Sequence, residues 1–221
     1  MMLYHACWSL VNIYGFAWSW FNSAYAYLWQ QSICCGFILL SGFCCIFSHS
    51  PVRRGMILFG WGAVITWATM AFFPAGEIWF GILTLLGVCM LLIPAVKRLP
   101  IAPAAGLGIS LLLFILLRGI NDGTAVFGLI PLPGAWYRNY FTAFLGFPPA
   151  DFSSADYFPL LPWFFLFLTG YFTGSLFQTL GWLSKLRGNV PPLSWLGRHS
   201  LLLYLLHQPV FIGIIWILMN I

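Results

Sequence analysis

Two histidines inside apolar stretches are the residues of this sequence best suited to chemistry. His5 lies in "MMLYHACW" at the start of the sequence, and His207 lies in "LLLYLLHQP" near its end. A neutral imidazole can act as a general base, and its surroundings tune its proton affinity. One such histidine is weak evidence, but two on different apolar segments favour a shared site with His5 as the candidate base.

A polar stripe accompanies His207. On an α-helix Ser200, Tyr204 and His207 fall within about 60° of one another, and Gln208 borders them. His207 would lie about 13 Å in from Arg198, close to the middle of a hydrocarbon core about 30 Å thick. Lipid cannot satisfy polar groups at that depth, so the stripe must face protein or water. It indicates either a functional cavity or an interhelical hydrogen-bond seam.

The composition of the chain predicts a membrane protein. Of its 221 residues, 62% are hydrophobic and 6% are charged, which is more apolar surface than one soluble core could bury. The apolar runs are continuous rather than alternating, which predicts an all-α integral membrane protein with a single domain over residues 1–221. We expect about seven transmembrane helices, at residues 1–20, 27–47, 54–73, 78–96, 101–118, 158–180 and 198–219.

The basic residues predict the orientation of these spans. Loops after the second, fourth and sixth spans hold seven of the nine basic residues: Arg53, Arg54, Lys97, Arg98, Lys185, Arg187 and Arg198. The other loops hold Arg118, Arg138 and all the acids. The positive-inside rule therefore predicts a multi-pass membrane protein with its N-terminus in the cytoplasm and its C-terminus outside. Because the formal charge of +5 is scattered in pairs, we predict no nucleic-acid partner.

The long segment 119–157 falls on the extracytoplasmic side. It is rich in Pro, Gly and aromatic residues, which argues against a flexible linker. A long ordered loop is often a lid or a binding surface. The alternative is an aromatic segment lying in the membrane interface, where Trp and Tyr are common. The sequence leaves both open.

Acidic and basic residues meet near this segment. Arg118, Asn121 and Asp122 lie at the outer end of the fifth span, and Asp156 opens "DYFPLLPW", which ends at Trp163. This group could hold a polar acceptor or form a buried ion pair that fixes the loop.

The six cysteines are interpreted as packing residues. Cys34 and Cys45 share a helix face but lie about 16 Å apart along the axis, too far for one metal or a disulfide. We therefore predict no metal site. Gly36, Ser41 and Gly42 are interpreted as close-packing positions. The sequence has no nucleotide-binding motif of the soluble folds.

Four blocks, "FILLSGFCCIFSHSPVRRG", "EIWFGILTLLGVCMLL", "DYFPLLPWFFLFLTGYFTG" and "LSWLGRHSLLLYLLHQP", resemble in order the bacterial relatives of the catalytic domain of heparan-α-glucosaminide N-acetyltransferase. The resemblance implies a transmembrane acyltransferase fold. It also implies acetyl transfer from cytoplasmic acetyl-CoA to an extracytoplasmic sugar or envelope glycan.

The resemblance also implies roles for individual residues. His5 matches a first-helix His that follows an Arg-Gly pair, and the sequence starts four residues before His5, so it holds no match to that pair. The lysosomal enzyme has a His in its first luminal loop, but the matching "GFAWSWFNSAYAYLWQQ" has none, so that residue is not carried over.

On this basis we expect His5, as base or transient acetyl carrier, to act with His207 and Gln208 as the catalytic set. The expected acetyl-CoA contacts are Arg198, His199, Ser200 and Tyr204. The expected acceptor contacts are Arg118, Asn121, Asp122, Asp156 and Trp163.

Two other function classes remain open at this point. A transporter or flippase would bind a small polar or lipid-linked substrate at midplane polar residues without making bonds. A non-catalytic membrane subunit would use its histidines only for packing. The sequence also leaves a homo-oligomer open.

Overall fold

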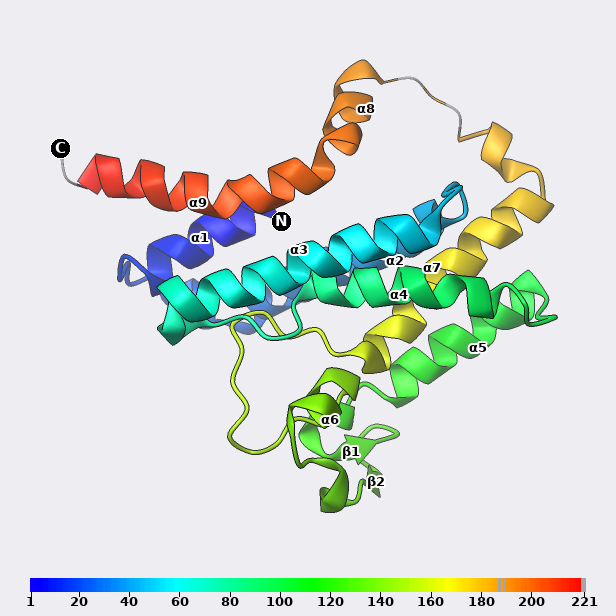
Figure 1. Ribbon diagram of the computed structural model, residues 1–221, viewed down its shortest axis with the longest axis horizontal. Helices are drawn as coiled ribbons and strands as arrows, with labels where there is room; N and C mark the ends of the chain where they lie inside the picture. The colour runs from blue at the N-terminus through cyan, green and yellow to red at the C-terminus, as the bar shows by residue number, and fades with distance from the viewer. Residues whose placement is uncertain (187, 189, 220–221) are drawn as a thin grey trace. The chain divides into compact units, whose positions relative to one another are not determined.

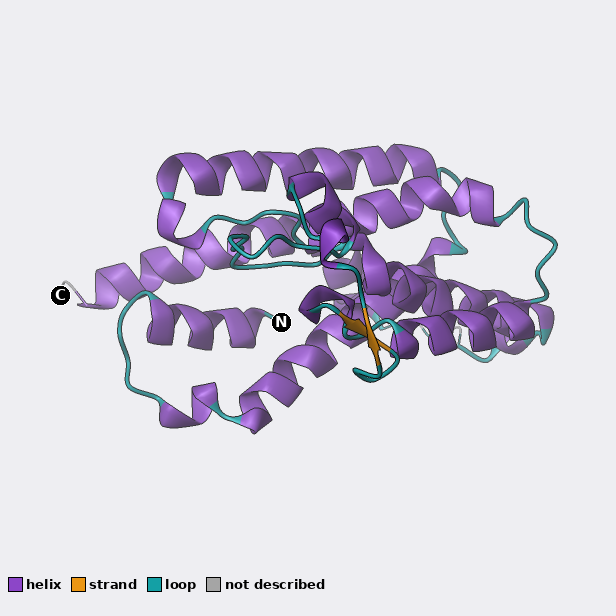
Figure 2. Cartoon of the chain, turned by 90° about the horizontal axis from the view of Figure 1, so that it is seen from below, coloured by secondary structure: helices purple, strands orange, loops and turns teal. Residues whose placement is uncertain are grey.

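A computed structural model describes residues 1–186, 188 and 190–219; Arg187, one of the basic loop residues, lies outside them. Figure 1 shows a helical chain, and Figure 2 shows two short strands among the helices. The helices are α1 (Met2–Asn12), α2 (Ala24–Cys45), α3 (Pro51–Phe72), α4 (Ile82–Val96), α5 (Pro103–Leu116), α6 (Tyr140–Leu145), α7 (Leu160–Thr179), α8 (Pro191–Arg198) and α9 (Ser200–Met219). Strands β1 (Thr124–Ala125) and β2 (Ile130–Pro131) form an antiparallel hairpin.

The helices confirm the all-α membrane class. Among the described residues, five segments are long and apolar enough to cross a bilayer: α2, α3, Pro103–Asp122 beginning with α5, α7 and α9. Helix α4 is a shorter apolar helix. At 1.5 Å per residue, a helix of about 20 residues matches the hydrocarbon thickness. The lipid bilayer is therefore the environment of this chain.

The internal contacts divide the chain into two compact units. Unit 1 contains residues 1–36 and 183–221, and unit 2 contains residues 37–182. Helix α2 begins in the first and ends in the second. The single domain over the whole chain stays a prediction, and each unit is described separately below.

Unit 2 is built on close helix packing. Helix α3 packs against α4, and α5 packs against α7. Helices α2 and α7 approach through glycine, since a Cβ added to Gly42 would lie 2.0 Å from the carbonyl oxygen of Phe167. The close-packing prediction is confirmed for Gly42 and stays a prediction for Ser41 and Gly36; at Gly36 an added Cβ meets none of the described atoms within 4 Å. The Thr169 hydroxyl donates to Ser110 Oγ across the α5–α7 interface (3.1 Å).

The first predicted span, residues 1–20, forms a shorter helix than expected. Helix α1 ends at Asn12, whose side-chain amide donates to the carbonyl of Trp8 (3.1 Å). Gly15 follows with a φ of +73°, and the N–H of Phe16 donates back to the carbonyl of Leu10 (3.0 Å). A left-handed glycine with this return bond is a common helix stop. Because apolar residues continue after Gly15, hydropathy does not indicate that the helix ends there.

The fourth and seventh predicted spans also begin differently. Helix α4 starts at Ile82 rather than at residue 78. The segment before it runs alongside the residues that precede α7, because Ala155 N–H donates to Glu77 and Phe158 N–H donates to Phe80. The seventh span, predicted from residue 198, begins two residues later as α9 at Ser200, after the short helix α8. Hydropathy alone does not register the later start of α4, because the residues on both sides of Ile82 stay apolar.

Candidate functional site

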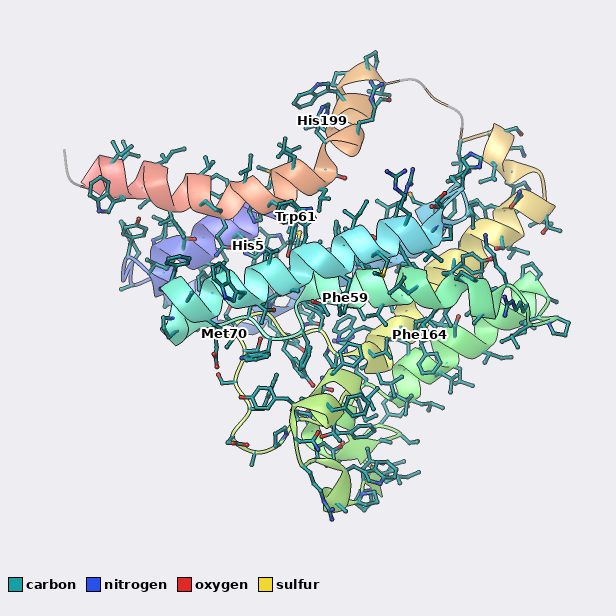
Figure 3. The ribbon with its side chains drawn as sticks, in the orientation of Figure 1. His5, Phe59, Trp61, Met70, Phe164 and His199 are labelled. Carbon is teal, nitrogen blue, oxygen red and sulfur yellow. The ribbon has the colours of Figure 1, made fainter. Side chains whose placement is uncertain are left out.

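Helices α1 and α9 pack together in unit 1 and bring the two predicted histidines into contact. The ring centroids of His5 and His207 lie 4.8 Å apart at an interplanar angle of 62°. Ser9, one helical turn after His5, is fully buried. The Tyr14 hydroxyl donates to the carbonyl of Ile212 (2.7 Å) and ties the end of α1 to α9. Figure 3 shows His5 on the part of α1 that lies along α9.

The His207 ring has a defined tautomer. Its Nδ1 lies 2.6 Å from the carbonyl oxygen of Tyr204. A carbonyl oxygen can only accept, so Nδ1 carries the proton and Nε2 keeps a lone pair. The side chain is 6% exposed, and its buried Nε2 has no hydrogen-bond partner among the described residues. A buried acceptor without a partner costs about 1–3 kcal/mol, so such an atom needs an explanation.

Aromatic rings surround the histidine pair. Tyr204 and Phe211 lie 5.6 Å and 6.2 Å from the His207 ring, centroid to centroid. On the other helix, Tyr4 lies 6.0 Å from the His5 ring. Gln208 is half-buried beside His207. The pair therefore sits in mostly apolar surroundings, where an imidazole lone pair has little competition from water.

The predicted acetyl-CoA contacts lie at the junction of α8 and α9. Arg198, His199 and Ser200 are all exposed there. His199 Nδ1 donates to the carbonyl of Trp195 (2.9 Å), and the two rings lie 4.6 Å apart. His199 marks the bend between the two helices in Figure 3. Along α9, this junction is about 12 Å from His207 at 1.5 Å per residue.

In unit 2 the structure brings two of the predicted acceptor contacts together. The guanidinium carbon of Arg118 lies 5.4 Å from the ring centroids of both Phe114 and Trp163, a cation–π arrangement. Asn121 lies in a short 3₁₀ turn, Ile120–Asp122. Its buried Oδ1 has no hydrogen-bond partner within the described part of the chain. Asp122 is exposed at the end of that turn.

Asp156 caps the start of α4. Its Oδ2 accepts from the backbone N–H of Ile82 at 3.4 Å. Burial raises the pKa of the Asp156 carboxyl to about 6, and the Ile82 hydrogen bond opposes that shift. A carboxyl with this pKa changes charge near neutrality and can take up or release a proton there. Sequence reasoning identified Asp156 but not the helix end that holds it.

Trp79 is a polar side chain that sequence reasoning missed. Its indole Nε1 is buried and lacks a hydrogen-bond partner in the described residues. Its ring lies 4.9 Å from that of Tyr140, and its backbone N–H donates to Ser154 Oγ (2.9 Å). The only available signal was the density of aromatic residues in both segments. Only the tertiary fold brings together segments this far apart in the sequence.

Over residues 1–186, 188 and 190–219, no group of three or more His, Cys, Asp and Glu side chains could hold a metal ion. The candidate groups are instead the histidine pair, the α8–α9 junction and the polar residues near the start of α4 and the end of α5.

Comparison with known proteins gives one family match. No curated protein and no solved structure matches this chain significantly. Residues 1–209 match a family described as heparan-alpha-glucosaminide N-acetyltransferase, catalytic. Because the match covers nearly the whole chain and the helices are those of a membrane protein, this protein belongs to that membrane acetyltransferase family.

Proposed function

We propose that this protein transfers an acetyl group from cytoplasmic acetyl-CoA to an amine or hydroxyl of an extracytoplasmic sugar or envelope glycan, assisted by His5 and His207. The observation that carries the proposal is the contact between the two rings, 4.8 Å apart. The buried His207 Nε2 has a lone pair with no hydrogen-bond partner among the described residues. Membership of the acetyltransferase family supports the reaction class.

The histidine pair is suited to hold one proton. An amine or hydroxyl that attacks an acyl carbon must lose a proton, and a positioned imidazole accepts it. The Tyr204 carbonyl fixes His207 Nδ1 as a donor, so Nε2 is the nitrogen free to accept. Two imidazolium ions at this separation repel one another. The pair therefore takes up a single proton and can return it to the leaving group.

The α8–α9 junction fits the anionic end of coenzyme A. Arg198 and His199 are exposed donors, and the first N–H groups of α9 have no partners within the helix. Arginine is well matched to phosphate geometry. When bound, acetyl-CoA supplies an activated acetyl thioester. Ser200 at the junction and Tyr204 one helical turn further along α9 lie on the His207 side of the junction, and they would contact the pantetheine arm.

The acceptor contacts are proposed in unit 2. Asp156 offers a carboxyl that is partly protonated near neutral pH, and Asn121 offers a buried carbonyl oxygen without a partner among the described residues. Charged groups such as Arg118 and Asp122 suit the hydroxyls of a sugar. Trp163 is 7% exposed and would act by holding the Arg118 guanidinium against its ring.

The test uses purified protein in nanodiscs with acetyl-labelled acetyl-CoA, offering glucosamine and then envelope glycans as acceptors. Wild type is compared with His5→Ala, His207→Ala and the matched control His49→Ala. His49 is exposed in the loop between α2 and α3. We expect release of CoA by wild type and His49→Ala, and its loss in the other two variants.

The outcomes separate the function classes. If acetyl-CoA binds but no CoA is released with any acceptor, the proposed acetyl transfer would be contradicted and the proposed acetyl-CoA site would still be supported. No binding by a folded protein would reject the proposal and favour a transporter. Equal CoA release by all four proteins would show that the histidines only pack.

A further inference from the structure

The tip of the β1–β2 hairpin is an exposed apolar surface. The strands pair Ala125 with Ile130, and residues 126–129 connect them. Phe127, Leu129 and Ile130 are 75%, 78% and 51% exposed. Val126 and Phe127 hold positive φ angles of 52° and 58°, which is uncommon for non-glycine residues and unfavourable for a β-branched one. A tip that presents large apolar side chains in a strained turn needs a partner to cover them.

A hydrogen bond fixes the hairpin to the end of a membrane helix within the same unit. The N–H of Val126 donates to the carbonyl of Leu116, the last residue of α5 (2.7 Å). The first residue of the turn between the strands is therefore in direct contact with a spanning segment.

The lipid-facing surface of that segment continues toward the tip. Ile109, Leu112 and Ile115 of α5 are exposed at 55%, 55% and 39%, as expected for a helix that faces acyl chains. Phe127 follows directly after the residue bonded to the last turn of the same helix. Lipid is the occupant expected on that exposed face of a membrane-spanning helix, and it is therefore the occupant that we argue for at the tip.

Backbone hydrogen bonding limits how deep the hairpin can lie. It has two strands of two residues each, so the outer edge of each strand has no strand beside it in the described residues. Open sheet edges do not occur in hydrocarbon, because their N–H and C=O groups would be unsatisfied. The strands must lie at headgroup level, with only the tip side chains reaching the acyl chains.

We propose that the hairpin tip, residues 126–130, inserts into the membrane interface beside the end of α5 and anchors segment 119–157 to the lipid surface. The partner is the boundary between phospholipid headgroups and acyl chains. This inference is independent of the proposed acetyl transfer, because it depends only on the hairpin, α5 and the bilayer.

The experiment uses full-length protein in phosphatidylcholine and phosphatidylglycerol nanodiscs, with the photocrosslinking residue p-benzoylphenylalanine introduced at one position at a time. The positions are Phe127 and Leu129 at the tip, Leu112 on α5 as the lipid-facing control, and Ser153 as the exposed loop control. Intact mass after irradiation measures the yield of lipid adducts. Circular dichroism and size-exclusion chromatography establish that each variant is folded.

We expect tip positions to give lipid-adduct yields close to that of Leu112 and several-fold above that of Ser153. Tip yields no higher than that of Ser153, with Leu112 still labelled, would overturn the proposal. Protein–protein adducts at the tip in place of lipid adducts would also overturn it and would identify a second copy of the chain as the partner. Leu129 provides an independent reading if the substitution at Phe127 prevents folding.

Discussion

At the scale of single residues, one hydrogen bond gives His207 its chemical character. The Tyr204 carbonyl holds the proton at Nδ1, and the buried Nε2 keeps a lone pair without a partner among the described residues. A histidine used only for packing is more stable with both ring nitrogens satisfied. The unsatisfied atom is therefore a stronger argument for function than the presence of a histidine in a membrane helix.

This argument predicts a similar loss of activity from two different amide substitutions of His207. His207→Asn keeps a donor near the Nδ1 position and removes the base, whereas His207→Gln places an amide near the Nε2 position. Neither amide accepts a proton at neutral pH, so both should lower CoA release by about 10²- to 10⁴-fold. Rates are measured under single-turnover conditions in nanodiscs, with bound CoA quantified separately. Full activity in either variant would exclude His207 as the proton acceptor.

The Asp156 carboxyl predicts a pH dependence of stability. Burial raises its pKa to about 6 from an ordinary value of 3.8, so the folded state binds this proton more tightly than the unfolded state. The resulting stability is present at low pH and is lost as pH rises through about 6.

Asp156→Asn removes this titration and keeps an oxygen that can accept from Ile82. We expect the melting temperature of wild type to fall relative to the variant as pH rises through about 6, measured by thermal unfolding in nanodiscs. If the melting temperatures of the two proteins change with pH in parallel, the Asp156 carboxyl does not titrate in that range.

At the scale of elements, glycine sets how closely helices approach. A Cβ at Gly42 of α2 would meet the Phe167 carbonyl of α7 at 2.0 Å, and a Cβ at Gly170 would meet the Leu39 carbonyl at 2.0 Å. Both contacts are with backbone atoms, which cannot rotate away as a side chain can. The two helices therefore depend on glycine from each side of the interface.

A matched pair of substitutions in α2 tests this contact. Gly42→Ala should destabilise the protein by about 1–3 kcal/mol, because the methyl group forces the helices apart. Gly36→Ala in the same helix meets nothing within 4 Å and should be neutral or stabilising by up to about 1 kcal/mol through helix propensity. Thermal unfolding of both variants in one detergent gives the comparison. Similar losses for the two would mean that close approach is not the cause.

At the scale of the whole molecule, charge orients the chain in the bilayer. Within unit 2, a Cβ added to Gly55 of α3 would lie 3.2 Å from the backbone nitrogen of Leu91 in α4, and one added to Gly62 would lie 2.9 Å from that of Thr84. The two helices therefore run antiparallel, and the exposed pairs Arg53–Arg54 and Lys97–Arg98 share one end of the unit. The positive-inside rule predicts that this end faces the cytoplasm.

Epitope insertion tests this orientation in full-length protein. A tag after His49 should be inaccessible to antibody in intact spheroplasts, and a tag after Ala150 should be accessible, because both positions are exposed loops on opposite predicted sides. Permeabilised cells provide the control for expression and tag recognition. The reverse pattern would invert the predicted sides of donor and acceptor.

The sequence by itself determined the membrane class and the approximate spans. Both follow from hydropathy summed over windows of about 20 residues, a local property that depends on no fold. It also identified His5, His207 and Asp156, because polar groups are rare in or beside apolar helices and therefore stand out.

Only the tertiary structure decided which of these residues meet and in what chemical state. The His5–His207 contact joins the two ends of the chain, and the Asp156–Ile82 bond joins segments far apart in sequence. Neither contact produces a periodic pattern in the sequence from which it could be predicted. The free lone pair of His207 likewise depends on which atoms surround the ring, and packing alone determines that.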